Sequence, residues 1–196
     1  MARQPRNEVA GSIYHATIHA VADAVMVANN RDRKIMLQAF AETAKRYGWE
    51  ILALAILDTH YHLLVRTPEA TLGAGMQYLN GTYAQSFNRR HARKGHLFGA
   101  RYFSKRVETE EHLVLTIRYI ALNGFNAGIA EHPRNDRWNS YPRVVGAFTR
   151  WHFVATRKLL AYLSPRPRSA FRKLILLVEG RDIHEERRQR RTALPP

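Results

Sequence analysis

Apolar residues recur along the first part of the chain with two different spacings, and the order of these spacings predicts the fold. Residues 14–22 alternate between apolar and polar side chains, and the run EILALAIL at 50–57 is apolar almost throughout, which is typical of a strand buried on both faces. The segment HYHLLVRT at 60–67 predicts a strand that pairs with 50–57 as a hairpin. A further strand is expected near 102–108.

Helical spacing fills the intervals between these strands. The first helix is expected to begin at the N-cap candidates Asn29 and Asn30 and to end at Gly48. A second helix is expected over 71–91, and a third opens at Thr109. The order β-α-β-β-α-β-α predicts an α+β protein, with a ferredoxin-like split β-α-β sheet whose helices pack on one face.

The last third of the chain has a different composition. From residue 131 the sequence EHPRNDRWNSYPR is polar and rich in proline, which predicts a connection over the surface, with Trp138 and Tyr141 pinning it to the core. Residues 143–163 and 167–180 are expected to be helical. The predicted division is a basic N-terminal arm at 1–12, a main domain at 13–130, and a linker with a basic helical C-terminal extension at 131–196.

The charge of the chain points to a polyanionic partner. Lys and Arg number 31 against 16 Asp and Glu, which gives a net charge of +15. We expect nucleic acid as the partner. An anionic membrane surface is the weaker alternative, because no segment approaches the roughly 18 apolar residues of a spanning helix. The absence of cysteine excludes disulfides, thiolate zinc sites and cysteine nucleophiles. No apolar run follows the basic N-terminus, so we do not expect a secretory signal. We expect a cytoplasmic, nucleoid-associated protein.

Basic residues are concentrated between Ser86 and Arg106, where no acidic residue occurs. Aromatic residues, Tyr102 among them, are interleaved, which predicts a groove that neutralises phosphates and stacks bases. The alternative is a solvated loop whose aromatic side chains belong to the core. Arg3 and Arg6 of the arm are further candidates for DNA contact, unless the arm is an unstructured start. The basic candidates in the segment are Arg89, Arg90, Arg93, Lys94, Arg101, Lys105 and Arg106.

The pair His60 and His62 carries the first candidate chemistry. Alternate residues of a strand point to the same face with Cα atoms about 6.5 to 7 Å apart, so two imidazoles can converge on one cation. The alternative is two partly exposed histidines on a half-solvated sheet face. His15 and His19 are expected to be packing or rim residues, on the argument that a spacing of four does not suit a strand face beside the metal.

Tyr119 and Asn123 carry the second candidate chemistry. They are four residues apart on the third helix, so a phenol and an amide share one helix face. A tyrosine at this place could attack a phosphodiester whose phosphate a metal ion polarises. The alternative is that Tyr119 is one more core aromatic of an amphipathic helix.

These motifs together resemble a known family. The sequence THYHLLV, followed by RYIALNGFNAG, resembles the histidine-hydrophobic-histidine motif and the tyrosine helix of the single-tyrosine HUH transposases, in particular the REP-associated tyrosine transposases. The similarity extends over about residues 1–145 and includes YHATIHA, GHLFGARY and WNSY. The later stretch RSAFRKLILLVEG also resembles the C-terminal part of that branch.

The resemblance implies a function and roles for four residues. The main domain would be an HUH/tyrosine transposase catalytic domain with a divalent metal ion, Mg²⁺ or Mn²⁺, bound by His60, His62 and the further polar ligand Asn123, and with Tyr119 as nucleophile. The family cleaves single-stranded DNA beside a hairpin, leaves a 5′-phosphotyrosine and a free 3′-hydroxyl, and rejoins strands by reversal without a nucleotide cofactor. The protein would act as a monomer or as a homodimer that exchanges tyrosine helices.

Three positions depart from the family pattern. Thr59 stands where the family usually has Asn, and NGFNAG replaces the more common NPVRAG, so that Gly124 and Asn126 replace a proline and a basic residue. Glycine lacks the fixed φ of proline, so a looser end of the tyrosine helix is expected, with an effect on turnover more than on fold.

The departures leave a second function open, a slow or inactive domesticated protein that binds DNA hairpins. A replication or plasmid-transfer initiator of the same HUH class is a third, but such proteins commonly carry extra domains, for which this chain has little room.

Overall fold

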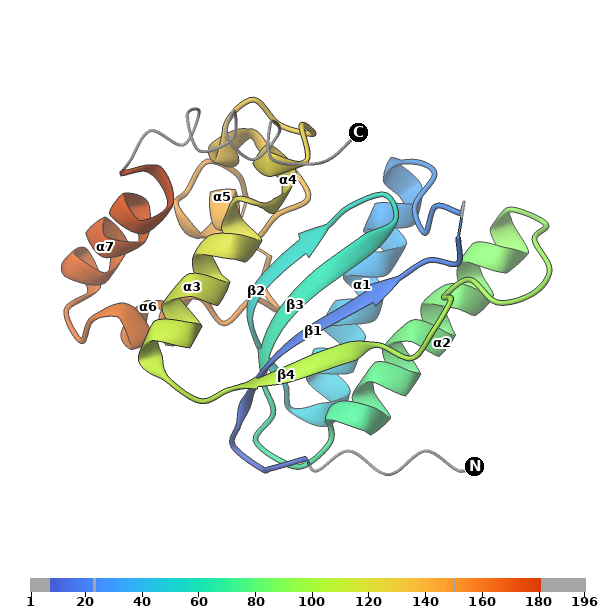
Figure 1. Cartoon of the computed structure of the whole chain (residues 1–196), viewed down its shortest axis with the longest axis horizontal. Helices are drawn as coiled ribbons and strands as arrows, with labels where there is room; N and C mark the ends of the chain where they lie inside the picture. Colours follow the sequence, from blue (N-terminus) through green and yellow to red (C-terminus); the bar gives the residue numbers. More distant parts are fainter. Residues whose placement is uncertain (1–7, 23, 150, 181–196) are drawn as a thin grey trace.

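The computed structural model describes residues 8–22, 24–149 and 151–180. The predicted DNA contacts Arg3 and Arg6 lie outside the described residues, as do the arginines near the C-terminus. The elements, shown in Figure 1, are β1 (Ile13–His19), α1 (Asn30–Tyr47), β2 (Glu50–Ile56), β3 (His60–Arg66), α2 (Leu72–Arg90), β4 (Phe103–Val107), α3 (Glu110–Ala121), α4 (Asn123–Asn126), the 3-10 helix η1 (Pro133–Asn135), α5 (Tyr141–Val144), α6 (Thr156–Leu163) and α7 (Pro167–Glu179).

The four strands form one antiparallel sheet in the order β2-β3-β1-β4. Helix α1 connects β1 to β2 and helix α2 connects β3 to β4, which is the split β-α-β arrangement of a ferredoxin-like fold. The predicted α+β fold class is therefore confirmed, and the strands and helices expected as far as the third helix are present. Their ends shift by a few residues, since the first strand ends at His19 and not at 22.

Caps fix both ends of α1 and the start of α3, the helix that carries Tyr119. The side chain of Asn29 accepts hydrogen bonds from two backbone N–H groups in the first turn of α1, and Gly48, at φ 64°, ends that helix in the left-handed region. The hydroxyl of Thr109 accepts a hydrogen bond of 3.0 Å from the backbone N–H of His112 and so caps α3. The three cap positions predicted from the sequence are confirmed.

The two faces of the sheet have separate hydrophobic cores. One face, which includes Tyr61 and Leu63 of β3, packs against α1 and α2, the helices of the split units. The other face, which includes Leu64, packs against α3 and the C-terminal helices α6 and α7. Figure 1 shows the sheet between these layers. The chain beyond β4 thus covers the face that a two-helix split sheet would leave open, and the prediction that the helices pack on one face alone is wrong.

The segment after residue 131 was expected to run over the surface, and this prediction is wrong. The backbone N–H of Ile56 donates to the carbonyl of Trp138 at 3.0 Å, and that of Ser140 donates to the carbonyl of Leu54 at 2.8 Å. Asn139, between them, is fully buried. The segment therefore pairs with the outer edge of β2, whose backbone groups would otherwise lack partners. Tyr141 is buried as well, in agreement with its predicted role as an anchor.

The continuous helix expected over 143–163 is also wrong. Helix α5 ends at Val144, and α6 begins only at Thr156. Between them the chain returns to the edge of β2, where the backbone N–H of Ala155 donates to the carbonyl of Ile51 at 2.8 Å. The helix expected over 167–180 is present as α7. Within the described ranges, the helices are all too short or too polar to cross a membrane.

Candidate active site

The histidine pair lies on β3, on the face of the sheet that α3 covers. His62 is 5% exposed and His60 is half-buried. Their ring centroids are 5.0 Å apart, with the ring planes at 88°. The two imidazoles are thus adjacent on one face, as the alternation of strand residues predicts.

Each imidazole has a threonine hydroxyl at its Nδ1 atom. Thr17 Oγ1 lies 2.9 Å from His62 Nδ1, and Thr59 Oγ1 lies 3.1 Å from His60 Nδ1. When Nδ1–H donates to the hydroxyl oxygen, Nε2 carries the free lone pair that a metal ion requires. Thr59, a departure from the family pattern, is therefore placed to orient His60.

Burial keeps the imidazoles neutral. Burial first, and then the charges of His15, His60 and His19, lower the pKa of His62 to about 3. Burial and the charge of His19 also lower the pKa of His60. A neutral imidazole is the form that binds a metal ion, so both side chains are in the required state at neutral pH.

His15 and His19 lie beside the pair, so the argument that a spacing of four keeps them away from it is wrong, while their role as packing or rim residues stays a prediction. His15 Nε2 is 3.2 Å from His62 Nδ1, and the ring of His19 stacks on that of His60 with centroids 4.6 Å apart. A spacing of four is two full periods of a strand, so both residues point to the same face of β1. The alternation in YHATIHA predicts that His15, Thr17 and His19 all point to this face.

Tyr119 reaches the histidines from α3. Its hydroxyl lies 3.4 Å from His62 Nε2, and the two ring centroids are 5.0 Å apart at 85°. The side chain of Tyr119 is 41% exposed. It is therefore not a core aromatic, and its hydroxyl lies beside the imidazole of His62.

Asn123 and Gly124 follow where α3 passes into α4. Asn123 is buried, one helical turn beyond Tyr119. Gly124 is buried too, and a Cβ built on it would lie only 2.0 Å from Asp136 Oδ2. Asp136 thus occupies the space that a proline side chain would need. The close packing at Gly124 opposes the looser helix end that the sequence led us to expect.

The donor set fits a divalent ion but is small. His60 and His62 present nitrogen, and Asn123 would add an amide oxygen. Within the described ranges, His, Cys, Asp and Glu form no group of three or more that is arranged to hold a metal ion. The site therefore rests on two imidazoles and leaves coordination positions for Asn123, water and phosphate oxygen.

The basic segment between α2 and β4 is only partly available to DNA. Arg89, Lys94, Arg101 and Lys105 are exposed. Other basic candidates have internal partners: Arg90 pairs with Asp32 at 3.5 Å, Arg93 donates to the carbonyl of His96 at 2.8 Å, and Arg106 pairs with Glu108 at 2.8 Å.

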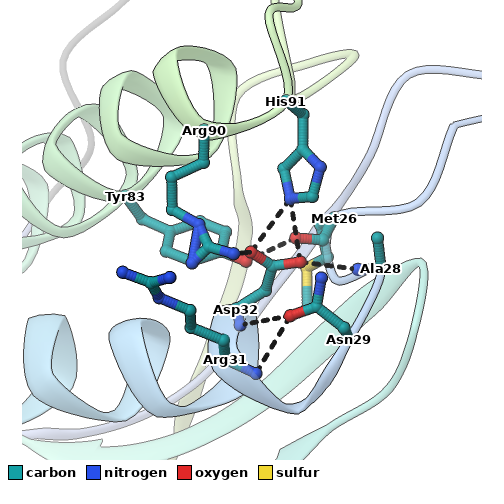
Figure 2. Close-up of polar contacts among 8 residues, drawn as sticks. All are labelled: Met26, Ala28, Asn29, Arg31, Asp32, Tyr83, Arg90 and His91. Carbon is teal, nitrogen blue, oxygen red and sulfur yellow. Dashed lines mark hydrogen bonds and ion pairs between the residues drawn. The ribbon is translucent and has the colours of Figure 1, made fainter.

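The buried carboxylate of Asp32 anchors the start of this segment. It accepts a hydrogen bond of 3.0 Å from the backbone N–H of Ala28, and His91 Nε2 lies 3.0 Å from both of its oxygens. Figure 2 shows that Arg90 and His91 approach it together from the end of α2. Arg90 is thus a structural partner of Asp32, and its predicted role in DNA binding is weakened accordingly.

The aromatic residues of the segment divide between core and surface. Phe87 and Tyr102 are buried, so the expected stacking of bases on Tyr102 has no exposed ring face to support it. Phe103 is 65% exposed on β4. In the sheet Phe103 is the partner of Thr17, which is the partner of His62, so the three side chains point to the same face. Lys105, the partner of His15, points there too.

Among the comparisons with known proteins, one family model covers more than half of the chain. Residues 9–123 match the family model described as "Transposase IS200 like". A search of the curated proteins finds no match. Among solved structures, a REP-associated tyrosine transposase bound to a REP hairpin is similar with a TM-score of 0.58 and 16% identity, over 74% of this chain and 86% of that one. A candidate transposase from Deinococcus radiodurans R1 aligns with a TM-score of 0.43 and 18% identity, over 58% of this chain and 92% of that one. At 16% identity the first of these structures supports the fold alone.

Proposed function

The chain belongs to the IS200-like transposase family, and from this membership we propose that it is a metal-dependent transesterase of single-stranded DNA. It would cleave and rejoin single strands beside DNA hairpins through a 5′-phosphotyrosine on Tyr119. Membership establishes a transposase, a DNA-processing enzyme. The mechanism, the metal and the hairpin substrate are the proposal.

One observation carries the proposal. Tyr119 is 41% exposed, and its hydroxyl lies 3.4 Å from Nε2 of His62, a buried imidazole whose pKa is lowered to about 3. An exposed phenol beside a neutral ring nitrogen brings nucleophile and metal ligand to one point. That arrangement suits attack on a bound phosphodiester.

The chemistry exchanges one ester bond for another. The phenolic oxygen of Tyr119 loses its proton and bonds to phosphorus, the bond from phosphorus to the 3′-oxygen breaks, and that oxygen takes up a proton. Because the phosphodiester bond is kept in the intermediate, rejoining needs no external energy source. The reverse step, with a 3′-hydroxyl as nucleophile, releases the tyrosine.

The metal site would be formed by His60, His62 and Asn123. The fit rests on the threonine hydroxyls at both Nδ1 atoms, which leave Nε2 free to bind. Mg²⁺ or Mn²⁺, when bound, would polarise the scissile phosphate and stabilise the charge that develops on it. Imidazole ligands suit Mn²⁺ better than Mg²⁺.

The DNA would follow the basic segment to the face of the sheet that carries His60 and His62, which we call the active face. Arg89, Lys94, Arg101 and Lys105 are exposed and can neutralise phosphates, and Phe103 offers an exposed ring to a base near Tyr119. Arg3 and Arg6 remain proposed contacts of the arm. A DNA partner would place the protein at the nucleoid.

A single chain holds every proposed catalytic group. Tyr119 lies against the histidines of its own chain, so the active site does not require a second copy. We therefore favour a monomer as the catalytic unit, with a homodimer as the alternative.

The test is replacement of Tyr119 with phenylalanine. A labelled single strand with a hairpin, incubated with Mn²⁺ or Mg²⁺, should give a covalent protein-DNA adduct with the unaltered chain and none with Tyr119→Phe. Tyr162→Phe is the matched control, because Tyr162 is also 41% exposed but lies on α6. An adduct that persists in Tyr119→Phe contradicts the assignment.

A second function is motivated by the departures Gly124 and Asn126. A domesticated hairpin-binding protein would bind hairpins tightly and with strong dependence on salt, but would release no cleaved strand in either metal ion. Detection of a nick beside the hairpin excludes it.

A further inference from the structure

The helix that carries Tyr119 ends two residues after it. Helix α3 spans Glu110–Ala121, and Asn123, the proposed metal ligand, begins α4. The carbonyl groups in the last turn of an α-helix have no donor further along the same helix, so they need partners from elsewhere. A side chain that binds the carbonyls at the end of α3 therefore bears on where the hydroxyl of Tyr119 lies.

Asn139, from the sequence WNSY, is such a partner. Its Nδ2 donates to the carbonyl of Ile120 at 2.7 Å and lies 3.4 Å from that of Ala121. Its Oδ1 accepts a hydrogen bond of 2.9 Å from the backbone N–H of Tyr141. Asn139 is fully buried, so loss of its amide would leave these groups without a partner. One end of the amide thus serves its own turn and the other serves α3.

The backbone of Asn139 lies level with His62 in the sheet. Asn139 forms an antiparallel bridge with Ala55 of β2, and Ala55 is the partner of His62 where β2 pairs with β3. The next residue, Ser140, holds the segment to β2, because its hydroxyl accepts a hydrogen bond of 2.9 Å from the backbone N–H of Leu54. Asn139, Ala55 and His62 therefore lie in one row across the strands.

The row and α3 together form a closed ring of contacts. The side chain of Asn139 binds Ile120, the neighbour of Tyr119, and the hydroxyl of Tyr119 returns to within 3.4 Å of His62 Nε2. The apolar contacts of α3 with the sheet have no preferred direction, and the hydrogen bond from Arg118 leads to α7. The hydrogen bond from Asn139 is directional, and it links α3 to the row that contains His62.

The same segment also contacts the start of α4. Asp136 Oδ1 accepts a hydrogen bond of 3.0 Å from the backbone N–H of Trp138, and a Cβ built on Gly124 would meet Asp136 Oδ2 at 2.0 Å. Gly124 directly follows Asn123. The segment therefore lies against the chain on both sides of the junction, at Ile120 and at Gly124.

We propose that Asn139 is a positioning residue for the cleavage reaction, and that its side chain sets the distance of the Tyr119 hydroxyl from His62. The inference rests on the proposed function, in which Tyr119 is the nucleophile. Because Asn139 is buried, it would not touch DNA. Its loss should therefore slow the chemical step and leave the binding of DNA unchanged.

Asn139→Ser removes the link to α3 and keeps the local turn. A serine hydroxyl can accept a hydrogen bond from the N–H two residues on, as Asn139 does from Tyr141, but the shorter side chain leaves the carbonyl of Ile120 without its donor. Ser140→Ala is the matched control, because it removes a buried hydrogen bond of the adjacent residue to β2. Urea unfolding establishes that both variants are folded under the conditions of the assay.

The chemical step is measured as single-turnover formation of the adduct on the labelled hairpin strand, with Mn²⁺ and saturating DNA. Asn139→Ser should be about 10- to 100-fold slower than the unaltered chain, as expected for a displacement of the nucleophile by about 1 Å. Ser140→Ala should keep the rate of the unaltered chain. In the Tyr119→Phe background both variants should bind the hairpin with unchanged affinity. A rate for Asn139→Ser equal to that of Ser140→Ala, or a loss of affinity that accounts for the slower rate, overturns the proposal.

A second measurement reports on Tyr119 without DNA and without a metal ion. Tyr119 is replaced by fluorotyrosine, and its fluorine NMR resonance is recorded in the otherwise unaltered chain and in both variants. The ring of Tyr119 lies 5.0 Å from that of His62, so a displacement changes its surroundings. The resonance should shift or broaden in Asn139→Ser and stay the same in Ser140→Ala. An unchanged resonance in Asn139→Ser overturns the proposal.

Asn139→Asp covers the case in which Asn139→Ser does not fold. It keeps the size of the side chain and the acceptor for the N–H of Tyr141 but offers no N–H to α3, so the same loss of rate and the same change of the resonance are expected. A match to Ser140→Ala in either measurement overturns the proposal. If the unaltered chain forms no adduct, the proposed cleavage fails, and the resonance alone decides the role of Asn139. An adduct that forms at the same rate in all these proteins removes the positioning role alone.

Discussion

A threonine hydroxyl lies beside Nδ1 of each histidine of the pair. Where Nδ1–H donates to the hydroxyl oxygen of Thr17 or Thr59, Nε2 is the nitrogen with a free lone pair. His15 also approaches Nδ1 of His62, at 3.2 Å. Burial and the charge of His112 lower the pKa of His15 to about 4, so this third imidazole adds no positive charge at neutral pH.

From this arrangement we expect Thr17→Val to weaken metal binding. The substitution keeps the shape of a buried side chain but removes the hydroxyl that orients His62, and loss of such partners typically costs about 10- to 100-fold in metal affinity. Mn²⁺ affinity is measured by titration without DNA. Thr43→Val is the control, since Thr43 is buried on α1 and its hydroxyl donates to the carbonyl of Ala39. Equal Mn²⁺ affinity in the two variants contradicts the role of Thr17.

The sequence was sufficient to predict part of this site. The period of a strand places His60 and His62 on one face, and the period of a helix places Tyr119 one turn from Asn123. The same strand period, applied to β1, would have added His15 and His19. No local pattern reveals that β1 pairs in the register that sets Thr17 opposite His62, because register depends on the whole sheet.

At the scale of elements, α7 holds α3, the helix that carries the proposed nucleophile Tyr119. The guanidinium Nε of Arg118 donates to the carbonyl of Leu177 at 2.9 Å, beside Tyr119 in the sequence. Leu174 of α7 packs in the same core as Ile117 of α3. The C-terminal extension therefore bears on the position of Tyr119, although it lies outside the residues that match the family model.

The end of α7 is in turn fixed by Glu179, which gives a prediction that depends on pH. Burial raises the pKa of Glu179, but hydrogen bonds from Arg134 and Tyr141 outweigh it, so the pKa lies below the usual value. A carboxylate with a lowered pKa stabilises the fold above its unfolded pKa, about 4.3, and this contribution is lost as the pH falls through the folded value.

Glu179→Gln should therefore reduce the free energy of unfolding by about 1 to 3 kcal/mol at pH 7. The difference from the unaltered chain should shrink when urea unfolding is repeated near pH 3. Glu108→Gln is the control, since Glu108 forms an exposed pair with Arg106 and its loss should have a much smaller effect. If the difference in the free energy of unfolding between Glu179→Gln and the unaltered chain stays constant with pH, the charge of Glu179 does not stabilise the fold.

Periodicity predicted the elements as far as α3 and also predicted α7, but it failed for the segment between them. Apolar residues such as Val154 do not lie in a helix, because they pack beside the edge of β2. The conformation of a segment that pairs with the edge of a sheet is set by the hydrogen bonds to that edge. The spacing of its own apolar residues does not reveal it. For the same reason the polar residues around Asn139 gave the appearance of a surface linker, while the backbone there is paired.

At the scale of the molecule, the excess of positive charge and an exposed aromatic ring come together on β4, at Lys105 and Phe103. Lys105 and Phe103 are two residues apart on β4 and point to the same side, yet they would act on DNA by different forces. A lysine neutralises a phosphate and releases a counterion, which makes its contribution depend on salt. An aromatic ring stacks on a base, and that contribution does not.

Hairpin DNA with a single-stranded flank should therefore separate the two residues by a salt titration in the Tyr119→Phe background. Lys105→Gln should reduce the slope of log affinity against log salt by about 0.7, the value for one phosphate of a single strand. Phe103→Ala should weaken binding by about 5- to 100-fold, equivalent to about 1 to 3 kcal/mol, at an unchanged slope.

Controls for this pair come from helices far from β4. Lys45→Gln removes an exposed charge on α1, and Leu176→Ala removes an exposed apolar side chain on α7. Both should leave the affinity for DNA and its slope against salt unchanged. If Lys105→Gln behaves like Lys45→Gln, phosphates do not pass over β4. If Phe103→Ala behaves like Leu176→Ala, the exposed ring does not meet a base. Either result would move the path of the DNA away from this edge of the sheet, since Phe103 and Lys105 are what tie that path to the side of His15 and Thr17.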